Sequence, residues 1–154
     1  MAGAATAAVL GVSGCSSQEE LAFDQARERV NTQAVNVQEF LGDWARARPS
    51  STTSAQVRSA VEYQYGTTSD NWMLLEVRDA PSGTEVDVSL RATGESGGGG
   101  FYAQQSLRTC LRLTLRTGQD GGVSAMKLTC PPLGETTWDG RVNADVELDE
   151  ESLR

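Results

Sequence analysis

Residues 101–117 read FYAQQSLRTCLRLTLRT and form the longest stretch of this sequence with a period of two. Neighbouring side chains of an extended chain point to opposite faces, so the alternation gathers leucine on one face and arginine on the other. Such a strand places its apolar face on a core and its polar face toward water, and the leucine face therefore requires a covering layer. The apolar face carries Leu107, Leu111, Leu113 and Leu115, and the other carries Arg108, Arg112 and Arg116.

Four further segments fit strands of the same sheet. Residues 84–92, TEVDVSLRA, alternate cleanly, and residues 71–79, NWMLLEVRD, precede them across an APSGT turn. Residues 123–130 return after a GQDGG turn, and residues 141–148, RVNADVEL, alternate as a candidate edge strand. The side chains expected on the core-facing sides are Met73, Leu75, Val77, Val86, Val88, Leu90 and Ala92. In the candidate edge strand, the alternating apolar residues are Val142, Ala144, Val146 and Leu148.

Two loop-like segments could in principle bind a ligand, but in each case we favour an interpretation without one. The GESGGGG run at residues 94–100 is expected to be a flexible loop, because a phosphate loop would lead into a helix and include a lysine. The DVELDEE run at residues 145–151 lacks the spacing of an EF-hand calcium loop. We interpret it as a solvated acidic edge.

The segment before the strands has the period of a helix. Apolar residues recur every three or four positions between residues 19 and 48, and Pro49 ends the pattern. A second, shorter helix is predicted from Ser54 to Tyr65, with Gly66 at its end. An aromatic-bearing stripe can line a ligand cavity, but it more often belongs to the core, which is our prediction here. The stripe consists of Leu21, Phe23, Ala26, Val30, Ala34, Val37, Phe40, Leu41 and Trp44.

Helices followed by an antiparallel meander predict an α+β fold. We expect a long N-terminal helix and a shorter helix packed on a curved antiparallel sheet of four to five strands. This order of elements resembles that of cystatins and of nuclear-transport-factor-2 proteins. The resemblance concerns architecture only, because one fold serves many functions.

Composition excludes several functional classes. The 154 residues include 13 basic and 21 acidic side chains, a formal net charge of −8, and no histidine. A Ser-His-Asp or Cys-His catalytic site and a His-ligated metal are therefore excluded. The acidic balance without a basic cluster argues against a nucleic-acid partner. We predict no catalytic residue, no metal site and no cofactor.

A short apolar run near the N-terminus ends at a cysteine. Residues 4–12, AATAAVLGV, fit the apolar region of a signal peptide. The next residues, Val12-Ser13-Gly14-Cys15, resemble the lipobox of bacterial lipoproteins. That resemblance implies cleavage before Cys15 and a diacylglyceryl group on its sulfur. The alternative is a buried cysteine at the end of an alanine-rich helix.

The other two cysteines are predicted to form a disulfide. If the turn centres on Asp120 and Arg116 pairs with Ser124, then Cys110 directly faces Cys130, close to bridging distance. Export would supply an oxidising compartment. A catalytic thiol pair is the rival interpretation, but the C-x-x-C spacing is missing.

The lipobox, the helix, the glycine-rich segment and the second cysteine followed by Pro131-Pro132 together resemble small exported lipoproteins of high-GC Gram-positive bacteria. These proteins have no assigned function, and the resemblance implies a location and a strand-to-strand disulfide but no active site. We divide the chain accordingly. The parts are a truncated lipoprotein signal peptide at 1–14, a lipidated tether at 15–20, a single α+β domain at 21–148 and an acidic tail at 149–154.

We expect a non-catalytic binding or accessory module, held by lipid on Cys15 at the extracytoplasmic face of the cell membrane. Its partner would be an unknown protein or small-molecule ligand. A purely structural envelope protein is the main alternative, and a hydrolase using carboxylates alone is less favoured. A deep pocket would favour the first function, facing carboxylates the hydrolase, and a filled core the structural protein.

Overall fold

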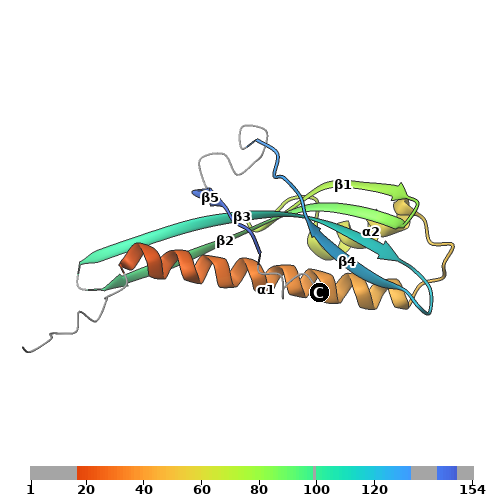
Figure 1. Ribbon diagram of the computed structural model, residues 1–154, viewed down its shortest axis with the longest axis horizontal. Helices are drawn as coiled ribbons and strands as arrows, with labels where there is room; N and C mark the ends of the chain where they lie inside the picture. Colours follow the sequence, from red (N-terminus) through yellow and green to blue (C-terminus); the bar gives the residue numbers. More distant parts are fainter. Residues whose placement is uncertain (1–16, 99, 133–141, 149–154) are drawn as a thin grey trace, which may run out of the picture.

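A long helix lies along one face of an antiparallel sheet (Figure 1). The computed structural model describes residues 17–98, 100–132 and 142–148. Helix α1 spans Gln18–Arg46, and the shorter α2, Ser54–Tyr65, packs against β1 at one end of the sheet. The predicted α+β fold is therefore confirmed. The strands are β1 (Trp72–Ala80), β2 (Gly83–Gly98), β3 (Phe101–Arg116) and β4 (Gly122–Lys127), in that spatial order, with β5 (Ala144–Asp145) paired to β3.

Both helices begin at capping boxes. The Ser17 hydroxyl accepts a hydrogen bond from the Glu20 amide at 3.1 Å, and the Glu20 carboxylate accepts one from the Ser17 amide at 2.8 Å. Residues 18–20, which we expected to belong to a tether, therefore form the first turn of α1. The predicted bounds of α2 are confirmed, and Gly66 caps its end with φ at +76°.

The face of α1 that meets the sheet is narrower than the sequence predicts. Small and branched side chains line it, while Leu21 and Phe23 remain 41% and 36% exposed. The prediction that these two belong to the core is wrong, because Ala22 between them contacts β2 and its neighbours turn aside by about 100° each. The buried apolar residues of α1 are Ala22, Ala26, Val30, Ala34, Val37, Leu41 and Ala45.

Strand β2 continues through the glycine-rich segment, so the loop expected there is wrong. Glu95 pairs with Gln104, and Gly98 pairs with Phe101 at the end of a long hairpin. The close approach of α1 explains why position 94 is a glycine. A Cβ there would lie 1.9 Å from the Ala22 carbonyl oxygen and 2.6 Å from the Ala26 nitrogen. Only a residue without a side chain lets the helix approach the strand this closely.

A bulge in β1 changes which side chains face the core. The register with β2 shifts between Leu74 and Glu76. As a result Trp72, Leu74 and Val77 contact the core, rather than Met73, Leu75 and Val77 as predicted. One extra residue reverses the alternation beyond it, and the predicted pattern assumed a regular strand.

The disulfide between Cys110 and Cys130 is present, but the predicted register is wrong by two residues. Arg116 pairs with Gly122, and Thr114 pairs with Ser124. Cys130 lies beyond the end of β4, with a Cα–Cα distance of 5.2 Å to Cys110. A shift of two residues keeps each side chain on its face, so the bond still forms on the side of the sheet away from α1.

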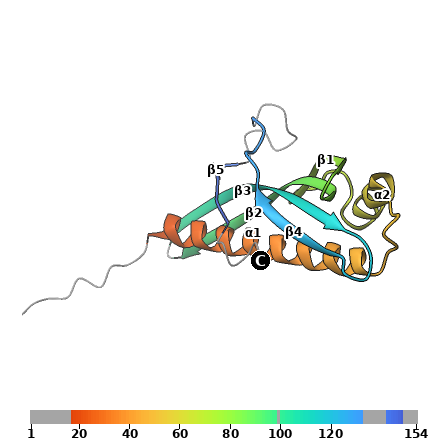
Figure 2. The ribbon, with the colours of Figure 1, turned by 45° about the vertical axis from the view of Figure 1, so that its right-hand side comes forward.

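Strand β5 runs parallel to β3, and was expected to be a longer edge strand. Figures 1 and 2 show it on the side of β3 away from α1. Backbone hydrogen bonds join Asn143 to Ser106 and Val146 to Arg108, both at 2.7 Å. The buried Arg108 guanidinium donates to both carboxylate oxygens of Asp145 at 2.7 and 2.9 Å. This pair holds the short strand in place.

None of the helices in the described ranges is both long and apolar enough to cross a membrane.

Replacing Gly94 by alanine is expected to lower the free energy of unfolding by roughly 3 kcal/mol, the upper end of overpacking costs. The added methyl group would meet helix backbone, which cannot turn away. Gly98→Ala is the matched control, since a Cβ at Gly98 has no atom within 4 Å. Urea unfolding followed by circular dichroism measures both. Equal midpoints for the two variants would show that the close approach does not exist.

Removing the disulfide is expected to cost about 3 kcal/mol, because the bond closes a loop across a sequence separation of 20. Both proteins compared carry Cys15→Ser, so only the bridge differs between them. The Cys110→Ala/Cys130→Ala variant should melt several degrees lower with an unchanged circular dichroism spectrum. An unchanged melting temperature under oxidising conditions would contradict a stabilising role.

Candidate functional site

A groove of about 780 Å³ lies between the C-terminal half of α1 and α2. Phe40 and Trp44 lie four residues apart on α1, which places them on one side of the helix, and Arg48 follows after four more residues. Arg48 lies just beyond the end of α1. The rest of the lining consists of Pro49 and Thr52 from the connection and of Ala55, Gln56, Ser59, Ala60, Tyr63 and Gln64 from α2.

Stacked aromatic rings hold the two sides of this groove together. Phe40 meets the edge of Tyr65 at 5.4 Å between ring centroids, and Tyr65 stacks on Trp72 at 4.6 Å. The Trp72 indole donates to the Gly66 carbonyl at 3.2 Å. Burial raises the pKa of Tyr65, which keeps its phenol neutral. Since the stack links α1, the end of α2 and β1, the groove is formed before any ligand arrives.

The charge of the groove differs from that of the whole chain. Its lining contains no aspartate or glutamate, although the protein carries a formal net charge of −8. The Arg48 guanidinium lies 5.2 Å from the centroid of the Trp44 ring, and Tyr63 is 93% exposed. Such a surface suits a neutral or anionic ligand that has an apolar face.

A smaller cavity of about 130 Å³ lies behind the stack, at the margin between α1 and the sheet. Tyr65, Trp72 and Leu90 contribute to its wall, as does Gln33. The Gln33 side-chain oxygen is buried and accepts no hydrogen bond from described protein atoms. The cavity has room for water, which would satisfy this oxygen. We therefore interpret this small cavity as a hydration site rather than as the deep pocket that would favour a ligand-binding function.

The face of the sheet away from α1 carries a network of ion pairs. Arg112 donates to both carboxylate oxygens of Asp87 at 2.8 Å. Arg78 contacts Asp87 at 3.1 Å and Glu85 at 2.5 Å, and it also pairs with Glu76. Asp87 is only 4% exposed. Four charged groups from three neighbouring strands therefore neutralise one another across this face, with Glu76 at the margin.

The pKa shifts of two acids, Asp87 and Glu147, run opposite to the shift that a hydrolase acid needs. Burial alone would raise the pKa of Asp87, but hydrogen bonds from Arg112 and Arg78 outweigh it and hold that pKa below its ordinary value. The Lys127 ammonium likewise lowers the pKa of Glu147. Glycan hydrolysis needs an acid whose pKa is raised, so both shifts run the opposite way.

The predicted site residues fall into two groups. Cys15 lies outside the described residues, whereas Cys110 and Cys130 form the disulfide on the sheet. Ser89 lies 3.4 Å from the Cys110 sulfur, and because a bridged sulfur has no proton, the Ser89 hydroxyl donates. In the described ranges, no three histidine, cysteine or acidic residues are grouped so that they could hold a metal ion.

The groove itself was missed by sequence reasoning, which assigned Phe40 and Trp44 to the core. Both are half-buried and pack against the core, and each also lines the groove. The usable signal was their spacing, since with Arg48 they form a row distinct from the alanine row that meets the sheet. The spacing alone could not show that this row faces α2, because that depends on how the two helices are arranged in space.

No protein-family model, no curated protein and no solved structure matches this chain. The similarity to exported lipoproteins and the order of elements shared with cystatins therefore remain sequence-based predictions.

Protonating Asp87 is expected to destabilise the protein. Because the folded pKa is lowered, the stabilisation is fully present above the unfolded value of about 3.9 and is lost as pH falls through the folded value. Asp87→Asn should unfold more easily at pH 7 by about 1–3 kcal/mol, and this difference should shrink between about pH 5 and pH 2. Urea unfolding at several pH values measures it.

Asp120→Asn is the control for the loss of one carboxylate, because Asp120 is exposed in the β3–β4 turn. Its stability should follow that of the unmodified protein at every pH. A difference between Asp87→Asn and the unmodified protein that stays constant down to pH 2 would contradict the proposed linkage.

Proposed function

We propose that this protein is a non-catalytic binding or accessory module, held on the extracytoplasmic face of the cell membrane by lipid on Cys15. The α1–α2 groove is its binding site. The main observation behind this proposal is an aromatic groove without acidic residues on a strongly acidic protein. The contacts among Phe40, Tyr65 and Trp72 support the groove from behind. The partner would be neutral or anionic and would place an apolar face against Trp44 and Tyr63.

The lipobox-like Val12-Ser13-Gly14-Cys15 supports the anchor. The Cys110–Cys130 disulfide agrees with export, since such bonds persist in oxidising compartments. Two or more acyl chains hold a protein on a membrane without a spanning helix, each buried methylene contributing about 0.8 kcal/mol.

The two alternatives account for less of the molecule. A carboxylate hydrolase would leave the charge pairing of Asp87 unexplained, because this pairing keeps the carboxylate ionised. A purely structural protein gives no reason for an aromatic groove without acidic residues on a strongly acidic protein. A binding module uses both features, one as framework and the other as contact.

The test is native purification of the affinity-tagged chain from membranes of the parent bacterium, followed by mass spectrometry of co-purifying proteins and small molecules. Replacing Arg48 and Tyr63 by serine should reduce recovery of the specific partner at least tenfold, because both side chains are exposed and line the groove. Cys15→Ser should move the protein out of the membrane fraction.

The matched control replaces Arg116 and Met126 by serine, an exposed cation and an exposed apolar residue on the sheet. Its partner recovery should equal that of the unmodified chain. Equal recovery with the groove variant would remove the groove from the proposal. No specific partner for the unmodified chain would favour the structural alternative, and a Cys15→Ser protein that stays membrane-bound would contradict the anchor.

A further inference from the structure

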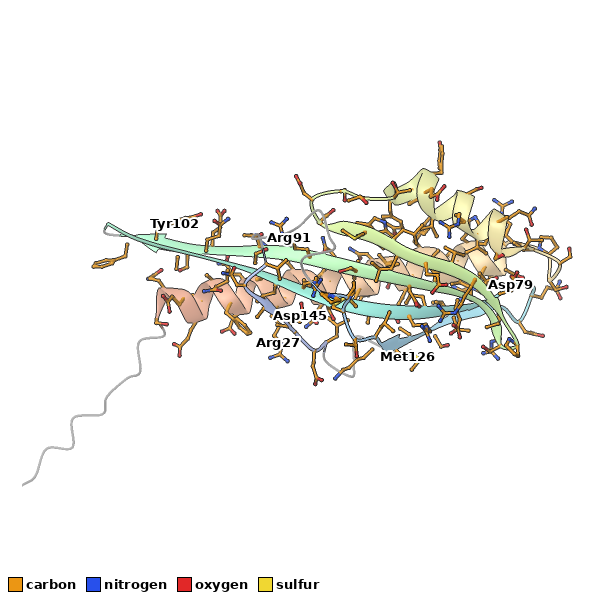
Figure 3. The ribbon with its side chains drawn as sticks, turned by 90° about the horizontal axis from the view of Figure 1, so that it is seen from above. Arg27, Asp79, Arg91, Tyr102, Met126 and Asp145 are labelled. Carbon is orange, nitrogen blue, oxygen red and sulfur yellow. A yellow bond between two sulfur atoms is a disulfide. The ribbon has the colours of Figure 1, made fainter. Side chains whose placement is uncertain are left out.

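Four large apolar side chains outside the core gather at the end of the molecule where α1 begins. Leu21 and Phe23 lie in the first two turns of α1, 41% and 36% exposed, and Phe101 and Tyr102 lie at the tip of the β2–β3 hairpin, 76% and 66% exposed. Six large apolar side chains are exposed among the described residues, and only Tyr63 and Met126 lie elsewhere. Figure 3 shows Tyr102 at this end, beside the start of α1.

The hairpin and the start of α1 form one unit. The Ser96 hydroxyl and the Gln18 side chain share a hydrogen bond, and the Glu95 amide donates to the Gln25 side chain at 3.3 Å. Gly94 brings the two backbones into contact just behind these bonds. The four apolar side chains are therefore held in a fixed relation to Ser17, the cap of the helix.

The shape of the tip leaves its aromatic rings uncovered. Phe101 pairs with Gly98, and Tyr102 pairs with Gly97, so the residue directly across from each ring has no side chain. The Tyr102 hydroxyl is hydrogen-bonded to the Glu95 carboxylate. Successive residues of a strand point to opposite faces, which places one ring on each side of the hairpin. The tip of the hairpin is therefore thin, with one aromatic ring on each side, and offers no flat surface for a protein partner.

We propose that this apolar end inserts into the interfacial layer of the bilayer that holds Cys15. The inference rests on the proposed lipid anchor. Cys15 precedes Ser17 by two residues in the sequence, and two residues of fully extended backbone span at most about 7 Å between Cα atoms. Acyl chains on Cys15 would place the four apolar side chains at the same leaflet, and aromatic residues favour this layer.

The surrounding charge selects the kind of lipid. Glu19, Glu20 and Asp24 accompany Phe23 around a surface hollow at this end, and Glu95 lies on the hairpin. These carboxylates would be repelled by anionic headgroups and tolerated by zwitterionic ones, most clearly at low ionic strength. The surface is thus suited to neutral lipid, and its attachment depends on apolar contact.

Insertion would fix the direction of the groove. Phe40 lies 22 residues along α1 from Gln18, a distance of about 33 Å at 1.5 Å per residue. Helix α2 lies toward the end of the molecule opposite the hairpin tip (Figure 1). The groove would therefore be presented away from the bilayer, where a partner can reach it.

The experiment attaches an environment-sensitive fluorophore to Gly98→Cys, at a position with no neighbour within 4 Å. The full chain carries Cys15→Ser and an N-terminal hexahistidine tag, and is held on phosphatidylcholine vesicles by nickel-chelating lipid. This tether replaces the acyl group, so the test does not depend on native lipidation. The fluorescence should shift to the blue and be quenched by lipids labelled with nitroxide near the headgroup.

The same fluorophore on Met126→Cys, on the outer face of the sheet, is the control and should show neither change. Phe101→Ser/Tyr102→Ser should abolish both changes at Gly98→Cys, and phosphatidylglycerol vesicles at low salt should reduce them at least threefold. Identical spectra at the two positions on tethered vesicles would overturn the proposal, as would changes that persist in the Phe101→Ser/Tyr102→Ser protein. If the tethered protein gives a positive result but Cys15 is not lipidated in the native protein, the proposed anchor is wrong and the insertion of the apolar end still holds.

Discussion

The contact between α1 and the β2–β3 hairpin at Gly94 determines much of the rest of the structure. Because a Cβ at Gly94 would lie 1.9 Å from a helix carbonyl oxygen, the helix axis and the strand approach as closely as backbones allow. Alanine faces the strand at that point, and the larger Leu21 and Phe23 are turned aside. About five to six turns farther along the same helix, Phe40 and Trp44 pack partly against the core and also line the groove beside α2.

The two faces of the sheet have separate roles. The face toward α1 is apolar and closed by packing. On the other face, Arg78 and Arg112 neutralise the acids of β1 and β2, while the disulfide and the Arg108–Asp145 pair hold the chain that follows β4. Charged groups used in this way position backbone and are poorly suited to proton transfer. Recognition is therefore expected at the ends of the molecule.

Periodicity predicted the layers of this fold but could not predict its registers. A pairing error of two residues leaves every side chain on its face, so the leucine pattern of β3 fits both the predicted and the observed partner of Arg116. The bulge after Leu74 leaves no mark in composition. Gly94 has the sequence signature of a loop, and only its contact with Ala22 explains why it lies in a strand. The groove was unpredictable for the same reason, since its two walls are separate helices.

An uninterrupted helix joins the two ends that we assign to membrane and partner. Helix α1 runs for 29 residues, about 43 Å, and is packed against β2, β3 and β4 along its length. A lipid bound at one end can change the affinity of the groove at the other end only through an element that has two arrangements. A helix packed in this way has a single arrangement. Membrane composition should therefore alter how the groove is presented and leave its intrinsic affinity unchanged. If the proposed anchor and groove are both correct, the molecule would act as a rigid spacer between a bilayer and a binding surface.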